Sequence, residues 1–142
     1  MKSTELRGKK IAIGQITFTS IKTYHMLKQD GIEVSMFFDR DYRMQHRKYK
    51  NTPIFPWANF HDVYVILTSQ NRYNELKKML VNSCGYPEEQ IILLDNIEFE
   101  CSELDVSGEY DWTWLKNNVQ DVSDAFIHYK SRILQKRLMD KN

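Results

Sequence analysis

The segment KKIAIGQITFTS, residues 9–20, places a glycine and several hydroxyl side chains directly after an apolar run. In a dinucleotide-binding turn, three glycines make the bend, let pyrophosphate approach the backbone and let the helix pack closely on the strand. Laid on this segment, that pattern puts Gly14 in the first position, Ile16 in the second and Thr19 in the third. Only the first role is filled by glycine, so we do not expect pyrophosphate to bind tightly in the usual pose.

The hydroxyl side chains after Gly14 offer a second way to hold a phosphate or a sugar. A helix N-terminus presents backbone N–H groups without partners and a partial positive charge. Thr17, Thr19 and Ser20 would add hydroxyl donors at that place. The same residue types are ordinary N-caps, so helix capping alone also explains them.

A carboxylate and a basic loop follow the second apolar run. Asp39 lies 25 positions after Gly14, near where a carboxylate accepts a hydrogen bond from a ribose in dinucleotide sites. Arg40 then begins a basic loop, DRDYRMQHRKYKN, which would hold a second phosphate as arginine does for NADP. The loop continues with Arg43, His46, Arg47, Lys48 and Lys50. A mobile, solvated loop is the alternative, because runs of charge are commonly solvent-exposed.

These features predict a site for a phosphate, a sugar or NAD(P), without a metal. The residues predicted to form it are Gly14, Gln15, Thr17, Thr19, Asp39, Arg40 and Ser69. None of the histidines shows a metal-binding spacing, and no motif places one beside a nucleophilic Ser or Cys: His25, His46, His61 and His128. We therefore expect no catalytic residues, and we expect His25 to be a solvated or core-edge histidine of the first helix.

Alternating strands and helices must position these residues. Apolar runs predict four strands, at 9–14, 32–38, 62–69 and 90–95, and a short edge strand at 52–57. Helical spacing predicts two helices, at 18–30 and 71–84. Strands joined through helices imply crossover connections and a mostly parallel sheet with helices on both faces. The expected fold is a small three-layer, Rossmann-like α/β domain over residues 1–100, with a flavodoxin-like strand order as the alternative.

The remaining segment, residues 101–142, carries the most regular pattern of the chain. Apolar residues recur at intervals of 3 and 4 positions from Trp112 to Ile133, without proline or glycine between them. Heptad spacing of this kind predicts a long amphipathic helix, roughly 45 Å for about 30 residues. The helix either bends, at Asn117-Asn118 or near Ser123, and folds back on its own domain, or pairs through residues 112–138 with a second copy or a partner helix.

Composition limits the class of partner. The chain has 142 residues, 42% of them hydrophobic, and a net charge of +1, so charge does not favour nucleic acid or a membrane surface. Residues 79–115 nevertheless hold 9 acidic and no basic side chains. Cys84 and Cys101 lack CxxC or zinc-site spacing and are expected to be reduced thiols. The polar start, MKSTELRGKK, indicates neither a signal peptide nor a membrane span, and we expect a cytoplasmic location.

The strand pattern resembles the small Rossmann-like domain at the N-terminus of bacterial sugar O-acyltransferases and related proteins of surface-polysaccharide biosynthesis. The similar segments cover residues 9–95 and are KKIAIG, GIEVSMFFDRD, NTPIFPW, DVYVILTS and EEQIILLD. The resemblance implies a domain that holds a nucleotide-sugar or a dinucleotide, with Gly14 and Asp39 at matching positions. Those acyltransferases also need a left-handed β-helix with a catalytic histidine, and this chain has no hexapeptide repeat.

Two functional hypotheses follow. The first is a noncatalytic module that binds a nucleotide or nucleotide-sugar in bacterial surface-polysaccharide metabolism. The alternative is a protein-interaction or assembly module with a vestigial pocket, which dimerises through the C-terminal helix. An enzyme with an unusual site built from Asp39, Arg40 and the Thr17 to Ser20 turn is a third, disfavoured reading, because no acid/base pair or nucleophile is identifiable.

Overall fold

The structure is a computed structural model, and it describes residues 1–119. Its sheet contains five parallel strands, β1 (Lys10–Gly14), β2 (Met36–Phe38), β4 (Thr52–Phe55), β5 (Val63–Leu67) and β6 (Ile91–Leu93). The short strand β3 (Lys48–Tyr49) pairs antiparallel with β4, and the order across the sheet is β3-β4-β2-β1-β5-β6. The predicted α/β fold with a mostly parallel sheet is confirmed.

The order of the parallel strands distinguishes the two arrangements that the sequence left open. Numbered along the chain, these strands lie in the order 3-2-1-4-5, as in a doubly wound dinucleotide-binding sheet, whereas a flavodoxin-like sheet runs 2-1-3-4-5. β1 is central, with β2 on one side and β5 on the other. In such sheets the ligand crevice lies at the carboxyl ends of the strands where the order reverses, which here is beside Gly14.

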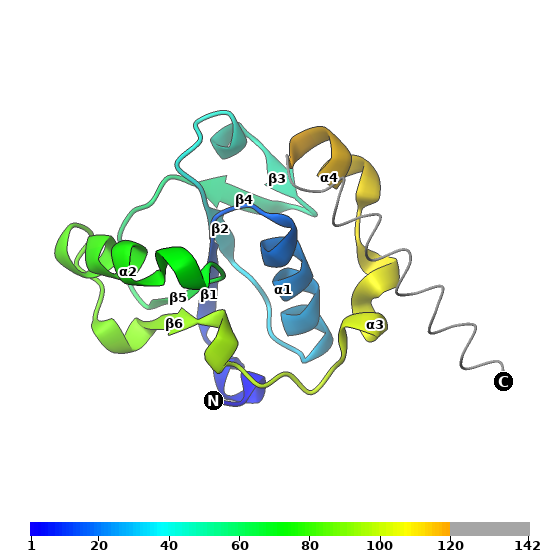
Figure 1. The fold of residues 1–142 in the computed structure, drawn as a ribbon, viewed down its shortest axis with the longest axis horizontal. Helices are drawn as coiled ribbons and strands as arrows, with labels where there is room; N and C mark the ends of the chain where they lie inside the picture. Colours follow the sequence, from blue (N-terminus) through cyan, green and yellow to red (C-terminus); the bar gives the residue numbers. More distant parts are fainter. Residues whose placement is uncertain (120–142) are drawn as a thin grey trace, which may run out of the picture.

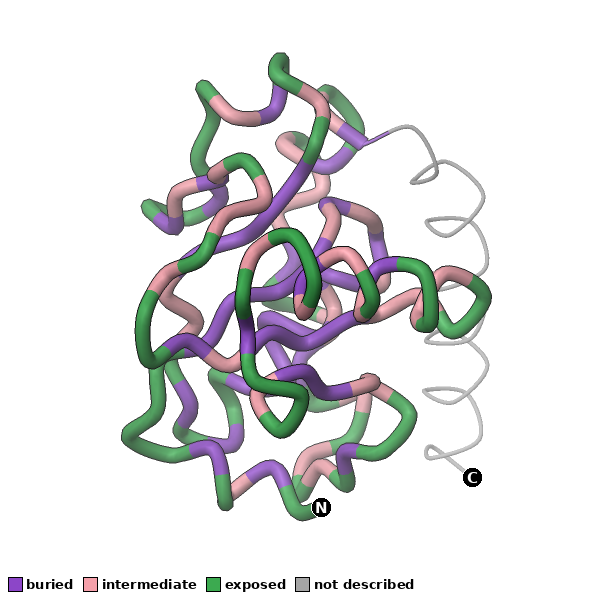
Figure 2. Tube along the Cα trace, turned by 90° about the vertical axis from the view of Figure 1, so that its left-hand side faces the viewer, coloured by how far each residue is buried: buried purple, intermediate pink, exposed green. Residues whose placement is uncertain are grey.

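Each face of the sheet is covered by one long helix (Figure 1). α1 (Phe18–Gln29) packs on one face and α2 (Tyr73–Asn82) on the other. Because side chains alternate along a strand, the neighbours Ala12 and Ile13 of β1 belong to different cores. Figure 2 shows the buried residues following the strands through the middle of the molecule. The three-layer arrangement therefore agrees with the prediction.

Strand β2, which follows α1, is shorter than the strand predicted there. The sequence predicted a strand over 32–38, but β2 begins only at Met36. Gly31 adopts a left-handed φ of 85°, and the Ile32 N–H donates to the carbonyl oxygen of Leu27 at 2.8 Å. Ile32 therefore closes the C-terminus of α1 and does not pair in the sheet.

Residues 101–119 pack on the face of the sheet that carries α1 (Figure 1). They form two short α-helices, α3 (Glu103–Val106) and α4 (Trp112–Asn118). The ring centroid of Phe18 lies 5.6 Å from that of Tyr110 and 5.7 Å from that of Trp112, and Leu115 is fully buried. The described part of the C-terminal segment thus shares the core of the sheet domain, while the predicted division at residue 100 stays a prediction.

The helix predicted from Trp112 onward is interrupted at Val119, next to Asn117-Asn118, where a bend was one of the alternatives. α4 ends at Asn118, and Val119 has extended backbone, with φ −119° and ψ 125°. The Asn118 side chain donates to the carbonyl oxygen of Trp114 at 2.7 Å and accepts a hydrogen bond from Arg47. The first apolar residues of the heptad pattern therefore serve their own domain, and the rest of the predicted helix, 120–142, lies outside the described residues.

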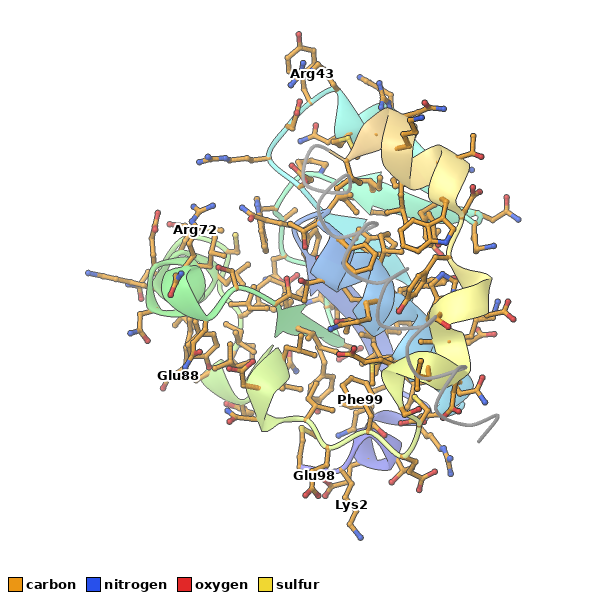
Figure 3. The ribbon with its side chains drawn as sticks, turned by 45° about the vertical axis from the view of Figure 1, so that its right-hand side comes forward. Lys2, Arg43, Arg72, Glu88, Glu98 and Phe99 are labelled. Carbon is orange, nitrogen blue, oxygen red and sulfur yellow. The ribbon has the colours of Figure 1, made fainter. Side chains whose placement is uncertain are left out.

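The amino edge of the sheet is closed around Asp30. This residue is 4% exposed, and its carboxylate accepts a hydrogen bond from the Ser3 hydroxyl at 2.6 Å. The carboxylate also accepts from the backbone N–H groups of residues 100–101 at 2.9 and 3.0 Å. Figure 3 shows Lys2 and Glu98, which form a β-bridge, together at this end of the molecule. The first residues and the segment after β6 are thereby tied to the end of α1.

Two expectations about chemistry and environment can be compared with residues 1–119. Cys84 and Cys101 are both free and half-buried, in agreement with unpaired thiols. Burial, followed by the hydrogen bond and negative charge of Asp30, raises the pKa of the Cys101 thiol to about 12. In this part of the chain no helix combines the length and the apolar character that crossing a lipid bilayer requires.

Candidate functional site

The turn between β1 and α1 is closed by its own side chains. Thr17 is the N-cap of α1, and its Oγ1 accepts a hydrogen bond from the Ser20 N–H at 3.2 Å. The Ser20 hydroxyl donates to the carbonyl oxygen of Gln15 and lies 3.3 Å from the Thr68 hydroxyl. Helix capping, one of the two roles predicted for these hydroxyls, is therefore the role that Thr17 fills.

Gly14 is required by side-chain packing on the α2 side of the sheet. A Cβ at Gly14 would lie 2.5 Å from the ring of Trp57 and 2.9 Å from Cδ2 of Leu67, so a larger residue does not fit. The left-handed residue of the turn is Gln15, with φ 57°, whereas Gly14 ends β1 in register with Phe38. The bend thus falls at Gln15, one residue later than predicted. Glycine at position 14 is required instead by the close approach of Trp57.

Asp39 joins the turn to the loop after β2, as the strand pattern predicted for this edge of the sheet. Its carboxylate is buried, and Oδ2 accepts a hydrogen bond from the Ile16 N–H at 2.9 Å. Oδ1 accepts from the Asp41 N–H at 2.8 Å, while the Gln15 N–H donates to the carbonyl oxygen of Phe38 at 3.0 Å. Each carboxylate oxygen keeps a second lone pair, which is available to accept a hydrogen bond from a ribose hydroxyl. Contact with a ribose stays a prediction.

A crevice with a volume of about 640 Å³ opens beside Asp39 at the carboxyl edge. Its walls come from the β1–α1 turn, from the loop after β2 and from the end of α4. The lining residues are Ile16, Thr17, Asp39, Asp41, Arg43, Met44, Arg47, Lys116, Asn117, Asn118 and Val119. The crevice therefore lies where ligands bind in sheets of this order, and the C-terminal segment completes it.

Arg47 and Lys116 are cations of this crevice without a salt bridge in residues 1–119. Asp41 instead pairs with Arg43, whose Nη2 lies 3.0 Å from Oδ2, and these hydrogen bonds from Arg43 lower the pKa of Asp41. Figure 3 shows Arg43 at the outer end of the loop after β2. Arg47 donates to the neutral side-chain oxygen of Asn118, and neither Arg47 nor Lys116 makes a salt bridge within residues 1–119. Positive charge is therefore available to a ligand on the α4 side.

The structure brings only part of the predicted site to the crevice. Thr17 and Asp39 line it. The other predicted residues lie outside its lining, and they are Gly14, Gln15, Thr19, Arg40 and Ser69. Arg40 is exposed and Ser69 is half-buried. At the end of β5 it is Thr68 whose hydroxyl donates to the carbonyl oxygen of Gly14, at 3.4 Å.

Sequence reasoning missed the residues that α4 contributes. Lys116 and Asn118 stand far from Gly14 in the chain, within a segment whose only visible signal was the apolar heptad pattern. That pattern does predict burial of Leu115 and Val119, which places the polar residues between them at the edge of the packed face. No local pattern, however, indicates which part of the sheet this face covers.

No metal centre is evident among the residues described, since no three or more His, Cys, Asp and Glu side chains are grouped to hold an ion. Comparison with protein-family models, with curated proteins and with solved structures finds no match to this chain. The resemblance to the N-terminal domain of sugar O-acyltransferases therefore stays a prediction.

Proposed function

We propose that this chain is a noncatalytic, Rossmann-like module that binds a nucleotide or nucleotide-sugar in the crevice at the carboxyl edge. The observation that carries the proposal is the meeting of Thr17, Asp39, Arg47 and Lys116 around a cavity of about 640 Å³. That volume lies within the range of roughly 300–1,000 Å³ typical of small-molecule sites. By the resemblance stated above, the ligand belongs to bacterial surface-polysaccharide metabolism.

The phosphates of the ligand are proposed to face Arg47 and Lys116, not the backbone of the β1–α1 turn. The Ile16 N–H is already bonded to Asp39, and the Ile16 side chain is buried at the place where a second glycine would leave room. Arginine and lysine side chains instead offer charge-assisted hydrogen bonds to phosphate oxygens. A ribose near Asp39 would use the free lone pairs of its carboxylate.

Calorimetry with UDP-sugars, NAD(H) and NADP(H) tests the proposal directly. We expect one of these ligands to bind with a Kd below about 1 mM, and we expect Arg47→Gln and Lys116→Gln each to weaken binding about tenfold. Lys78→Gln on α2, which is exposed and outside the crevice, is the matched control and should leave the Kd unchanged. Absence of heat with every ligand up to millimolar concentration would remove the proposal.

Assembly through the C-terminal segment is the second candidate function. The observation in its favour is the heptad pattern, which continues in the sequence through Phe126 and Tyr129 to Ile133. Trp112 and Leu115 pack on their own domain, so self-association would have to use the later part of the pattern. Light scattering on the full chain and on Phe126→Asp/Tyr129→Asp tests this, and an unchanged monomer in both would count against assembly.

A further inference from the structure

A second cavity, with a volume of about 250 Å³, lies between segments that are far apart in the sequence. The last turns of α1, the turn between β3 and β4, and the segment from α3 onward form its walls. Its lining residues are His25, Lys28, Gln29, Lys50, Val106 and Glu109, and none of them lines the crevice at the carboxyl edge. The volume is below the range of roughly 300–1,000 Å³ for drug-sized ligands, so this cavity suits a small ion.

His25 forms the buried wall of this cavity and presents a hydrogen-bond donor to it. The residue is 4% exposed, and its Nε2 lies 2.6 Å from the Tyr49 hydroxyl. That hydroxyl accepts from the Asp111 N–H at 3.4 Å, and we assign its own proton to the bond with Nε2, since the roles of these two atoms depend on the imidazole tautomer. This assignment leaves the imidazole proton on Nδ1, for which the described residues provide no acceptor.

Two lysines from different segments stand at the mouth of the cavity. Lys28 comes from α1 and Lys50 from the β3–β4 turn; both are exposed, and neither makes a salt bridge within the described residues. Burial, followed by the charges of Lys50 and Lys28, lowers the pKa of His25 to about 4. Both positive charges therefore act on the same buried ring. Two cations close to a neutral N–H donor favour the binding of an anion in this cavity.

We propose that the cavity is a binding site for a small oxyanion such as phosphate, held by His25 Nδ1–H, Lys28 and Lys50. The amide of Gln29 supplies a further neutral donor, whereas Glu109 is the acidic residue of the lining and opposes an anion. The proposal does not depend on nucleotide binding, because the two sites share no lining residue. A bound oxyanion would link the β3–β4 turn to the end of α1.

Nuclear magnetic resonance of the His25 ring during titration with inorganic phosphate tests this site specifically. Ionic strength is held constant with chloride, so that general screening is separated from binding. We expect a saturable change of the His25 ring signals below about 10 mM phosphate, together with a rise in the pKa of His25, since a bound anion favours the protonated ring. Sulfate and acetate titrations then show whether a tetrahedral dianion or a carboxylate binds better.

Variants of the full chain decide between a built site and diffuse attraction. Lys28→Gln and Lys50→Gln should each weaken the His25 response about fivefold, and Glu109→Gln should strengthen it about twofold. Lys48→Gln, an exposed control outside the lining, should change nothing, and neither should Arg47→Gln in the carboxyl-edge crevice. A His25 response that is linear in phosphate, or unaffected by the loss of Lys28 and Lys50, would overturn the proposal.

Discussion

Replacement of His25 by Gln should remove a large part of the acid sensitivity of folding. The His25 ring is almost fully buried and bonded to Tyr49, and its pKa falls from 6.5 to about 4. Burial is the main cause, and the neighbouring lysines add to it. The charged groups around the ring come from α1, the β3–β4 turn and the C-terminal segment, and they are Lys28, Lys50 and Glu109.

The sign of the effect follows from the two pKa values. Between about pH 6.5 and pH 4 the unfolded chain binds a proton at His25 that the folded chain does not, so folding stability rises with pH in this window. The stabilisation is fully present above the unfolded pKa and is lost as the pH falls towards the folded pKa. At about 1.36 kcal/mol for each pKa unit, the loss amounts to about 3 kcal/mol.

Urea unfolding of the wild type and of His25→Gln at several pH values between about 7.5 and 4.5 measures this loss. Over that range the free energy of unfolding of the wild type should fall by about 2–3 kcal/mol more than that of the variant. Any constant cost of removing the bond to Tyr49 cancels in this comparison. His61→Gln, at an exposed position, is the control and should follow the wild type. Equal pH dependence of wild type and His25→Gln would refute the reasoning.

Three further predictions concern the stability of the fold, and each is measured by urea unfolding. Asp30→Ala should lower the free energy of unfolding by about 3 kcal/mol, because it leaves the Ser3 hydroxyl and two backbone N–H groups without their acceptor. Gly14→Ala should cost about 2 kcal/mol through contact with Trp57, and Trp57→Leu in the same chain should recover part of that cost, whereas additive losses would contradict the contact. Lys50→Asn should stabilise the fold by about 0.5–1 kcal/mol, because Lys50 adopts φ 45° and Asn tolerates this conformation better; a loss of stability would contradict this.

The elements of the fold were predictable where a single local signal decided them. The unbroken apolar run at Val63–Leu67 gave a central strand, and the helical spacing after Thr17 gave α1 with its N-cap. The strand predicted from residue 32 was too long, because Ile32 is apolar and buried for another reason: it caps the preceding helix. Burial of a residue can be read from its type, but its hydrogen-bond partner cannot.

The candidate sites depend on contacts between distant residues, which the sequence does not display. His25 was expected to be solvated or at the edge of the core, yet it is buried because the β3–β4 hairpin brings Tyr49 against it. That hairpin was itself missed, since β3 is only 2 residues long and lies in a loop that reads as basic and polar. Lys116 reaches the carboxyl-edge crevice in the same way, through the packing of α4 on the sheet domain.

The way the β1–α1 turn is built determines what kind of affinity its crevice can have. In a glycine-rich turn, backbone N–H groups bind the phosphate, and they are fixed in place before the ligand arrives. Here Asp39 accepts from the Ile16 N–H and Thr17 accepts from the Ser20 N–H, so two N–H groups of the turn are already bonded. In the proposed site, the attraction for phosphate comes mainly from the side chains of Arg47 and Lys116. These charges are exposed and strongly screened by salt. Binding in the crevice should therefore weaken steeply as ionic strength rises, whereas a site built from backbone amides would lose much less.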